Sequence, residues 1–238
     1  MGCASSKAQS DGVQDLGDLA ASRPTNSGHE ADLTANNLEQ ALGMMAAYIR
    51  SRGRHIRLVV VGGVVSTMLL RTRESTQDID FFSDQISKKD TEILRQASSH
   101  VRGQITDPRL GEGWFNNRTI LFIPADIRKV LAREGVEQNA VVFEASGLTL
   151  LSAPFAYQFC SKVHRIAGGG GKLYDSSDAA DYLHEYLRRQ HLATIGASEI
   201  DQLLQRYRVQ ANERGLGSAY QDVNQAFAAR YGVPAITQ

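Results

Sequence analysis

The side chains best placed for chemistry are Asp78 and Asp80, two aspartates separated by one apolar residue. In a strand, side chains two positions apart point to the same side, so these carboxylates would converge while Ile79 and Phe81 pack behind them. Two facing carboxylates repel each other unless one is protonated or a cation lies between them. Oxygen ligands arranged in this way suit Mg²⁺ (or Mn²⁺) bound together with substrate phosphates. The alternative is a solvated strand start at which an aspartate ends a turn.

A glycine pair, Gly62-Gly63, precedes the aspartates in the sequence. It ends a β-branched run, Ile56 to Val61, which is typical of a buried strand. The apolar segment Val64 to Leu70 then predicts a short buried helix. The N-terminus of such a helix presents backbone N–H groups to a phosphate, and Ser66 would add a hydroxyl. Any tight strand-to-helix turn can use two glycines, so the pair gains weight only from the residues that follow it.

Several elements must position these residues. Apolar spacing predicts a helix that contains Leu38, Leu42 and Met45, with Asn36 or Asn37 as its N-cap. The other expected elements are strands over 56–61, 119–123 and 141–144, and helices over 88–97, 126–133, 154–167, 182–190, 198–211 and 220–231, with a further helix opening at 175. The fold class that follows is α/β (α+β), with a small mixed sheet, flanking helices and further helices at the C-terminal end.

The N-terminus carries a separate signal. Gly2 follows the initiator methionine and Ser6 lies four residues later, which is the N-myristoylation pattern. Cys3 sits where a palmitoyl chain is commonly added, and two chains anchor a protein stably whereas one binds marginally. We expect attachment to the cytoplasmic face of a membrane, in a eukaryotic cytosol or after delivery into one. The alternative is an ordinary frayed terminus.

Composition divides the chain into three parts and bears on its partners and its redox compartment. Residues 8–33 are rich in small and polar residues, so residues 1–33 predict a disordered lipidated tether, residues 34–150 an α/β core, and residues 151–238 a helical region. Lys plus Arg and Asp plus Glu both number 26, which gives no clear nucleic-acid patch. The two cysteines, Cys3 and Cys160, favour a reducing compartment.

The pattern Gly-Gly, apolar helix, R-x-S-T-x-D-I-D resembles the nucleotidyltransferase (DNA polymerase β-like) superfamily, and within it the minimal AbiEii-like toxin branch. The resemblance covers about residues 56–185. It implies that a glycine turn and the following helix hold a nucleoside triphosphate, that paired aspartates bind divalent ions, and that a third carboxylate on a neighbouring strand completes the site. The residues matched to nucleotide binding are Gly62, Gly63, Ser66, Arg73 and Thr76, and those matched to the metal are Asp78 and Asp80.

The third carboxylate has two candidates. Glu144 ends an expected strand and is the first choice, whereas Asp126 is its rival. A solvated strand end explains Glu144 equally well.

The resemblance also extends to a helix bearing a lysine, followed by a loop, a basic residue and D-x-x-D. Lys162, Lys172, Asp175 and Asp178 fall at those places, and the likeness would put Lys162 close to the chemistry. Helical spacing places Lys162 on or near the side of its helix opposite the apolar face. Helix capping by Asp175 or Ser176 is a sufficient structural explanation for the acidic residues.

Together these features predict a nucleotidyltransferase that passes a nucleotidyl group from a nucleoside triphosphate to an acceptor hydroxyl while tethered to a membrane. The alternative, from another class, is a catalytically silent module of the same fold that binds or scaffolds at the membrane. Function inferred from likeness of fold is analogy, and it needs the site itself for support.

Overall fold

The computed structural model describes residues 31–84 and 86–237. The elements in chain order are β1 (Leu33–Thr34), α2 (Ala35–Ser51), β2 (Ile56–Val61), the π-helical turn η1 (Val65–Leu69), β3 (Ser75–Thr76), β4 (Ile79–Phe82), α3 (Lys88–Gln104), β5 (Phe115–Asn116), the 3₁₀ turn η2 (Arg118–Leu121), α4 (Ala125–Gln138), β6 (Val141–Ala145), β7 (Leu148–Ser152), α5 (Phe155–Ala167), α6 (Asp175–Gln190), β8 (Ile195–Gly196), α7 (Ala197–Arg206), α8 (Glu213–Tyr231) and β9 (Ile236–Thr237).

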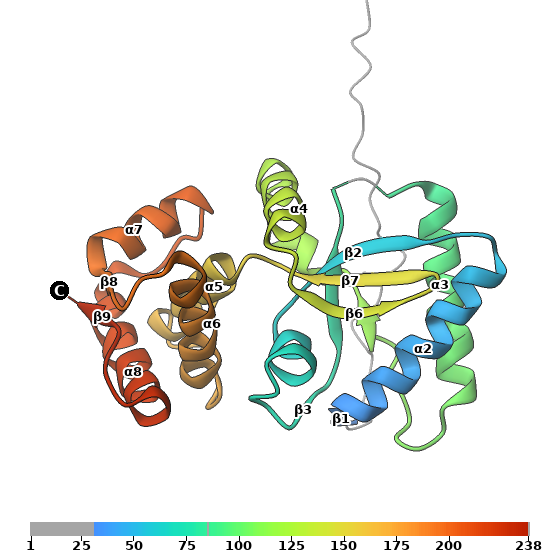
Figure 1. Cartoon of the computed structure of the whole chain (residues 1–238), viewed down its shortest axis with the longest axis horizontal. Helices are drawn as coiled ribbons and strands as arrows, with labels where there is room; N and C mark the ends of the chain where they lie inside the picture. Colours follow the sequence, from blue (N-terminus) through green and yellow to red (C-terminus); the bar gives the residue numbers. More distant parts are fainter. Residues whose placement is uncertain (1–30, 85, 238) are drawn as a thin grey trace, which may run out of the picture.

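The expected α+β class is confirmed. The central sheet has the strand order β5-β4-β2-β7-β6, in which β2 runs parallel to β7 and antiparallel to β4. Strand β5 lies parallel to β4, and β6 is antiparallel to β7. Figure 1 shows the sheet with its flanking helices at one end of the molecule and helices α5 to α8 gathered at the other. The sheet is therefore mixed, with β2 in its centre.

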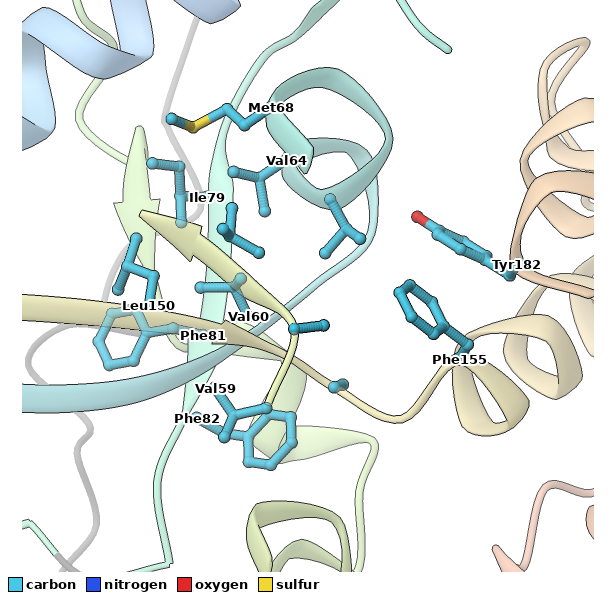
Figure 2. Packing of buried hydrophobic residues seen from close by; sticks show 14 of the residues in the cluster. Val59, Val60, Val64, Met68, Ile79, Phe81, Phe82, Leu150, Phe155 and Tyr182 are labelled. Carbon is cyan, nitrogen blue, oxygen red and sulfur yellow. The ribbon is translucent and has the colours of Figure 1, made fainter. Parts of the chain in front are cut away.

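The apolar faces of the central strands form the main core. Val60 and Ile79 face Met68 of η1 and Val64, the residue directly before η1, as Figure 2 shows, and all four side chains are buried. Phe81 stacks on a phenylalanine of β5, with 4.6 Å between ring centroids. Burying a side chain of this size stabilises the fold by roughly 1.5–3 kcal/mol. Ile79 and Phe81, the two neighbours of Asp80 in the chain, thus hold β4 in place.

The expected strands agree with the structure in part. Strand β2 has the expected bounds, and β6 covers the expected run with one residue more. The expected strand over 119–123 was wrong, because the N–H groups of Ile120 and Phe122 bond to carbonyls three residues earlier and close a 3₁₀ turn. Strand β7 was not expected. All of its residues are buried, and they are apolar or small, which suits a strand that lies between β2 and β6.

Two helix caps also differ from expectation. Thr34, not Asn36 or Asn37, caps α2, and Asn37 completes a reciprocal capping box with it. Tyr174 is the N-cap of α6 without a side-chain cap bond, because Asp175 makes other contacts. The expected lipidation residues, Gly2 and Cys3, lie outside the described residues, whereas the last residue of the expected tether, Leu33, belongs to β1.

The helical end packs around α5. Cys160 is buried there, as expected, and burial raises the pKa of its thiol. Helix α8 crosses α5 so closely that a Cβ added to Gly215 would lie 2.1 Å from the carbonyl oxygen of Ala167. No described helix is both long and apolar enough to cross a membrane.

This close approach predicts opposite effects of two substitutions in α8. Gly215→Ala should lower the free energy of unfolding by roughly 1–3 kcal/mol, because the new methyl overlaps backbone. Gly217→Ala should raise it by roughly 0.5–1 kcal/mol, because nothing lies within 4 Å of the added Cβ and alanine favours a helix. Urea unfolding of both variants measures this. Shifts of the two midpoints in the same direction would contradict the packing described.

Candidate functional site

The paired carboxylates and the glycine turn meet at one end of the sheet. In the antiparallel pair of β2 and β4, Asp80 lies opposite Val61, the residue directly before Gly62-Gly63. A Cβ added to Gly63 would lie 2.3 Å from Thr76 Oγ1 and 3.0 Å from Arg73 Nη1, so only glycine fits there. The structure therefore brings together the residues of the first sequence motif.

Asn116 and Arg118 complete the surroundings of the carboxylates. Asn116 lies beside Asp80 on β5, is fully buried and donates from Nδ2 to Asp78 Oδ2 at 3.4 Å. Burial and the charge of Asp78 raise the pKa of Asp80 to about 7, while Arg118 and Asn116 offset part of that rise. Asp80 is thus poised to hold a proton near neutral pH, and a cation bound to the pair would displace that proton to solvent.

The structure does not bring Glu144 to this cluster. Glu144 lies on β6, at the opposite edge of the sheet from β5, and it pairs with Thr149, which pairs with Arg57 near the start of β2. Its rival Asp126 forms an ion pair with Arg208 at 2.9 Å. Among the described residues, no group of three or more His, Cys, Asp or Glu side chains is arranged to hold a metal.

Sequence reasoning missed Asn116. The residue beside Asp80 on the neighbouring strand is this amide and not a third carboxylate. The available signal was the polar pair Asn116-Asn117 directly after the apolar Trp114-Phe115.

A buried lysine joins the loop and helix that follow α5. Lys162 Nζ lies 2.8 Å from Asp175 Oδ1 and 2.6 Å from Asp178 Oδ2, and all three side chains are buried. Arg165 reaches Asp175 at 3.0 Å. The structure thus brings together the lysine and the D-x-x-D pair. Lys162 does not lie on an exposed helix face, because α6 covers it.

Arg73 connects this network to the glycine turn. Its guanidinium stacks 3.8 Å from the ring centroid of Tyr174 and lies 3.7 Å from Asp178 Oδ2. Burial raises the pKa of Tyr174, but a hydrogen bond from Lys172 and the charge of Arg73 outweigh it and lower the pKa overall. Arg73 therefore links the glycine turn to the network around Lys162, although the two lie about 100 residues apart in the sequence.

Ser66 faces the protein and not an open site. Its hydroxyl is fully buried and lies 2.9 Å from the hydroxyl of Tyr182, which donates to the carbonyl oxygen of Gly62 at 2.8 Å. Figure 2 shows the Tyr182 hydroxyl directed at the turn that carries Val64. Because the Tyr182 hydroxyl donates its hydrogen to Gly62, the Ser66 hydroxyl must be the donor in its hydrogen bond to Tyr182.

The backbone of Gly62 is held from both sides. Its N–H donates to Gln158 Oε1 at 3.0 Å, and its carbonyl accepts from Tyr182. The N–H of Val65 also donates to this carbonyl, at 3.0 Å. These amides are used within the protein, so a phosphate near the turn would depend chiefly on side-chain cations.

The raised pKa of Asp80 predicts a pH dependence in protein free of divalent ions. An unfolded aspartate has a pKa of about 3.9, so between pH ~4 and ~7 the folded state keeps a proton that the unfolded state has lost. The free energy of unfolding should therefore fall as pH rises through this range, by roughly 2–4 kcal/mol. Asp80→Asn should remove this fall.

Chemical denaturation at a series of pH values measures the slope. Asp222→Asn, at an exposed aspartate on α8, is the matched control and should keep the wild-type slope. Equal slopes for Asp80→Asn and wild type would show that Asp80 is not the titrating group.

Comparison with known proteins identifies the family. Neither curated proteins nor solved structures gave a match to this chain. The family model described as "Domain of unknown function (DUF7582)" matches residues 30–230, which include both the sheet with its aspartates and the helices that carry Lys162 and Tyr182. The chain belongs to this family of unknown function, DUF7582.

Proposed function

We propose that this chain is a metal-dependent nucleotidyltransferase that passes a nucleotidyl group from a nucleoside triphosphate to an acceptor hydroxyl. The observation that carries the proposal is the position of Asp80 opposite Val61, which sets two carboxylates beside the Gly62-Gly63 turn. Arg73 contacts that turn and the helical end together. The resemblance of the first motif to nucleotidyltransferases supports the same assignment.

The donor set fits a divalent cation. Asp78 and Asp80 would hold Mg²⁺ (or Mn²⁺), since this ion binds through one or two carboxylates together with substrate phosphates. Burial raises the pKa of Asp80, and the repulsion from Asp78, which a cation would relieve, adds to the rise. When bound, the ion would neutralise charge on the phosphates and on the leaving group. Asn116 orients Asp78 through its hydrogen bond.

The phosphates would be oriented by cations on the other side of the turn. Arg73 is partly exposed and Lys172 exposed, which leaves both accessible to a ligand. Lys162 is buried and balanced by two carboxylates, so we assign it a positioning role: it fixes the start of α6, and with it Tyr174 under Arg73. The chain's contribution is positioning and charge neutralisation, which dominate phosphate chemistry.

The second candidate is a catalytically silent module of the same fold at the membrane. On β5, the strand next to β4, the position beside Asp80 holds Asn116 and not a third acidic residue that could bind a metal. Arg118 already offsets part of the charge of Asp80. Under this alternative, protein groups alone stabilise the two carboxylates. A nucleotide then has no metal-dependent affinity.

We also propose a peripheral position at the cytoplasmic face of a membrane. Its support is the acylation pattern of Gly2 and Cys3, in which the second chain converts marginal binding into stable anchoring. The acceptor hydroxyl would then be one that is accessible at that surface.

Thermal unfolding of the full chain with ATP, GTP, CTP or UTP tests the transferase proposal. One nucleotide should raise the melting temperature only when Mg²⁺ is present, because a ligand at 100 times its Kd adds about 2.7 kcal/mol of stability to the native state. The double variant Asp78→Ala/Asp80→Ala should lose this shift. Asp84→Ala, at an exposed aspartate just after β4, should keep it.

Two outcomes count against the proposal. A shift that persists in the double variant would place the nucleotide elsewhere. The lack of a shift with any nucleotide at millimolar concentration would favour the silent module.

A further inference from the structure

A single crossing of the described chain joins the sheet to the helical end. The elements from β1 to β7 form the sheet with its flanking helices, and those from α5 to β9 follow them in the chain. The two parts are linked at Ala153-Pro154, between β7 and α5. A short link of this kind can act as a hinge, so other contacts must fix the orientation of the helical end.

Helix α4 holds the link itself. The side chain of Gln138, the last residue of α4, accepts from the N–H of Phe155 at 2.9 Å and donates to the carbonyl oxygen of Ala153 at 3.2 Å. Arg189 of α6 donates to the carbonyl oxygen of Gln138 at 2.9 Å. The C-terminal end of α4 therefore fixes the point at which the two parts meet.

The same helix binds the C-terminal end of α7. Glu134 accepts hydrogen bonds from Arg206 and from the hydroxyl of Tyr207, the second at 2.9 Å. Asp126, about two turns earlier on α4, pairs with Arg208 at 2.9 Å. Three consecutive residues thus contact two carboxylates of α4, and we call these three residues the α7 clamp.

The contact between the α7 clamp and α4 is polar and largely exposed. The side chains of Arg206, Arg208 and Asp126 are each more than half exposed, whereas Glu134 is 12% exposed. A cavity of about 360 Å³, lined by residues of α4, α6 and α7, lies beside the contact. Arg208 also adopts a left-handed backbone conformation, with φ of 51°, which is uncommon for a residue with a Cβ. Because exposed ion pairs are weak, this contact can open without the loss of a packed core.

A different set of contacts holds the helical end on the glycine turn. Gln158 and Tyr182 bind the backbone of Gly62, and Arg73 lies 3.7 Å from Asp178. Figure 1 shows α4 above the sheet and the segment between β2 and β3 below it, with the link from β7 to α5 between them. Two sets of contacts thus flank one link, so a rotation of the helical end about that link affects both.

We propose that the α7 clamp is a releasable lock on the orientation of the helical end. While the clamp holds α4, the helical end stays docked on the glycine turn. When the clamp opens, the helical end rotates about Ala153-Pro154 and the glycine turn loses its support. The inference concerns motion of the fold and does not rest on nucleotidyl transfer. The clamp and the glycine turn are then coupled through one two-state element, the hinge.

Hydrogen–deuterium exchange of the full chain tests this coupling. In Arg206→Gln/Arg208→Gln, the peptide that covers residues 62–69 should exchange roughly threefold to thirtyfold faster, because loss of the ion pairs favours the open orientation. Peptides from α2 should keep the wild-type rate. Arg188→Gln is the matched control, since it removes an exposed ion pair with Glu185 inside α6, and it should leave the rate at 62–69 unchanged.

A charge exchange provides a rescue. Arg208→Glu should speed exchange at 62–69, because it places a second carboxylate beside Asp126. Asp126→Arg/Arg208→Glu should restore most of the protection, because the pair forms again with its signs reversed. Both positions are exposed, so the variants should remain folded, and thermal unfolding checks this.

Three results would overturn the proposal. The first is faster exchange that stays within α7 and leaves 62–69 as in wild type. The second is an equal rise in α2 and at 62–69, which would mean that the whole fold is loosened. The third is a reversed charge pair that gives no more protection at 62–69 than Arg208→Glu alone.

Discussion

The arrangement depends on how the helical end holds the backbone of Gly62. The N–H of Gly62 donates to Gln158 of α5, and its carbonyl accepts from Tyr182 of α6. Each such bond contributes on the order of 1 kcal/mol, but a buried donor or acceptor left without its partner costs more than that. The helices therefore fix the turn at the end of β2, and the turn fixes where Arg73 and Thr76 approach it.

Two groups of charges then face each other across that turn. On the sheet side, burial and the charge of Asp78 raise the pKa of Asp80. On the helix side, Lys162 is balanced by Asp175 and Asp178. Removing one member of a buried ion pair leaves an uncompensated charge and is strongly destabilising. The helix-side network therefore acts as a rigid support, whereas Arg118 and Asn116 offset only part of the rise in the pKa of Asp80 on the sheet side.

Local features of the sequence predicted the local parts of this site. The bounds of β2 follow from a β-branched run. The two aspartates lie near each other, as the two-residue repeat of a strand led us to expect, but β4 begins only after Asp78, at Ile79. The buried apolar face of α5 follows from helical periodicity in the same way. These properties depend on neighbouring residues only.

The remaining parts depend on contacts that no local pattern contains. Glu144 was chosen as a third carboxylate because it ends a strand, but β7 lies between β6 and β2 and sends it to the far edge. Asn116 comes from a two-residue strand too short to give a periodic signal. Tyr182 reaches Gly62 from 120 residues away. Periodicity identified the exposed side of α5 but not that α6 would cover Lys162.

A crystal structure with Mn²⁺ and a non-hydrolysable nucleoside triphosphate tests the central claim most directly, because anomalous scattering locates the metal. We predict manganese bound by Asp78 and Asp80, with the triphosphate lying between that ion and Arg73 at the glycine turn. Carboxylates that remain bound by Asn116 and Arg118, without metal or nucleotide, would contradict the account. In that case the fold would serve at the membrane as a binding module and not as a transferase.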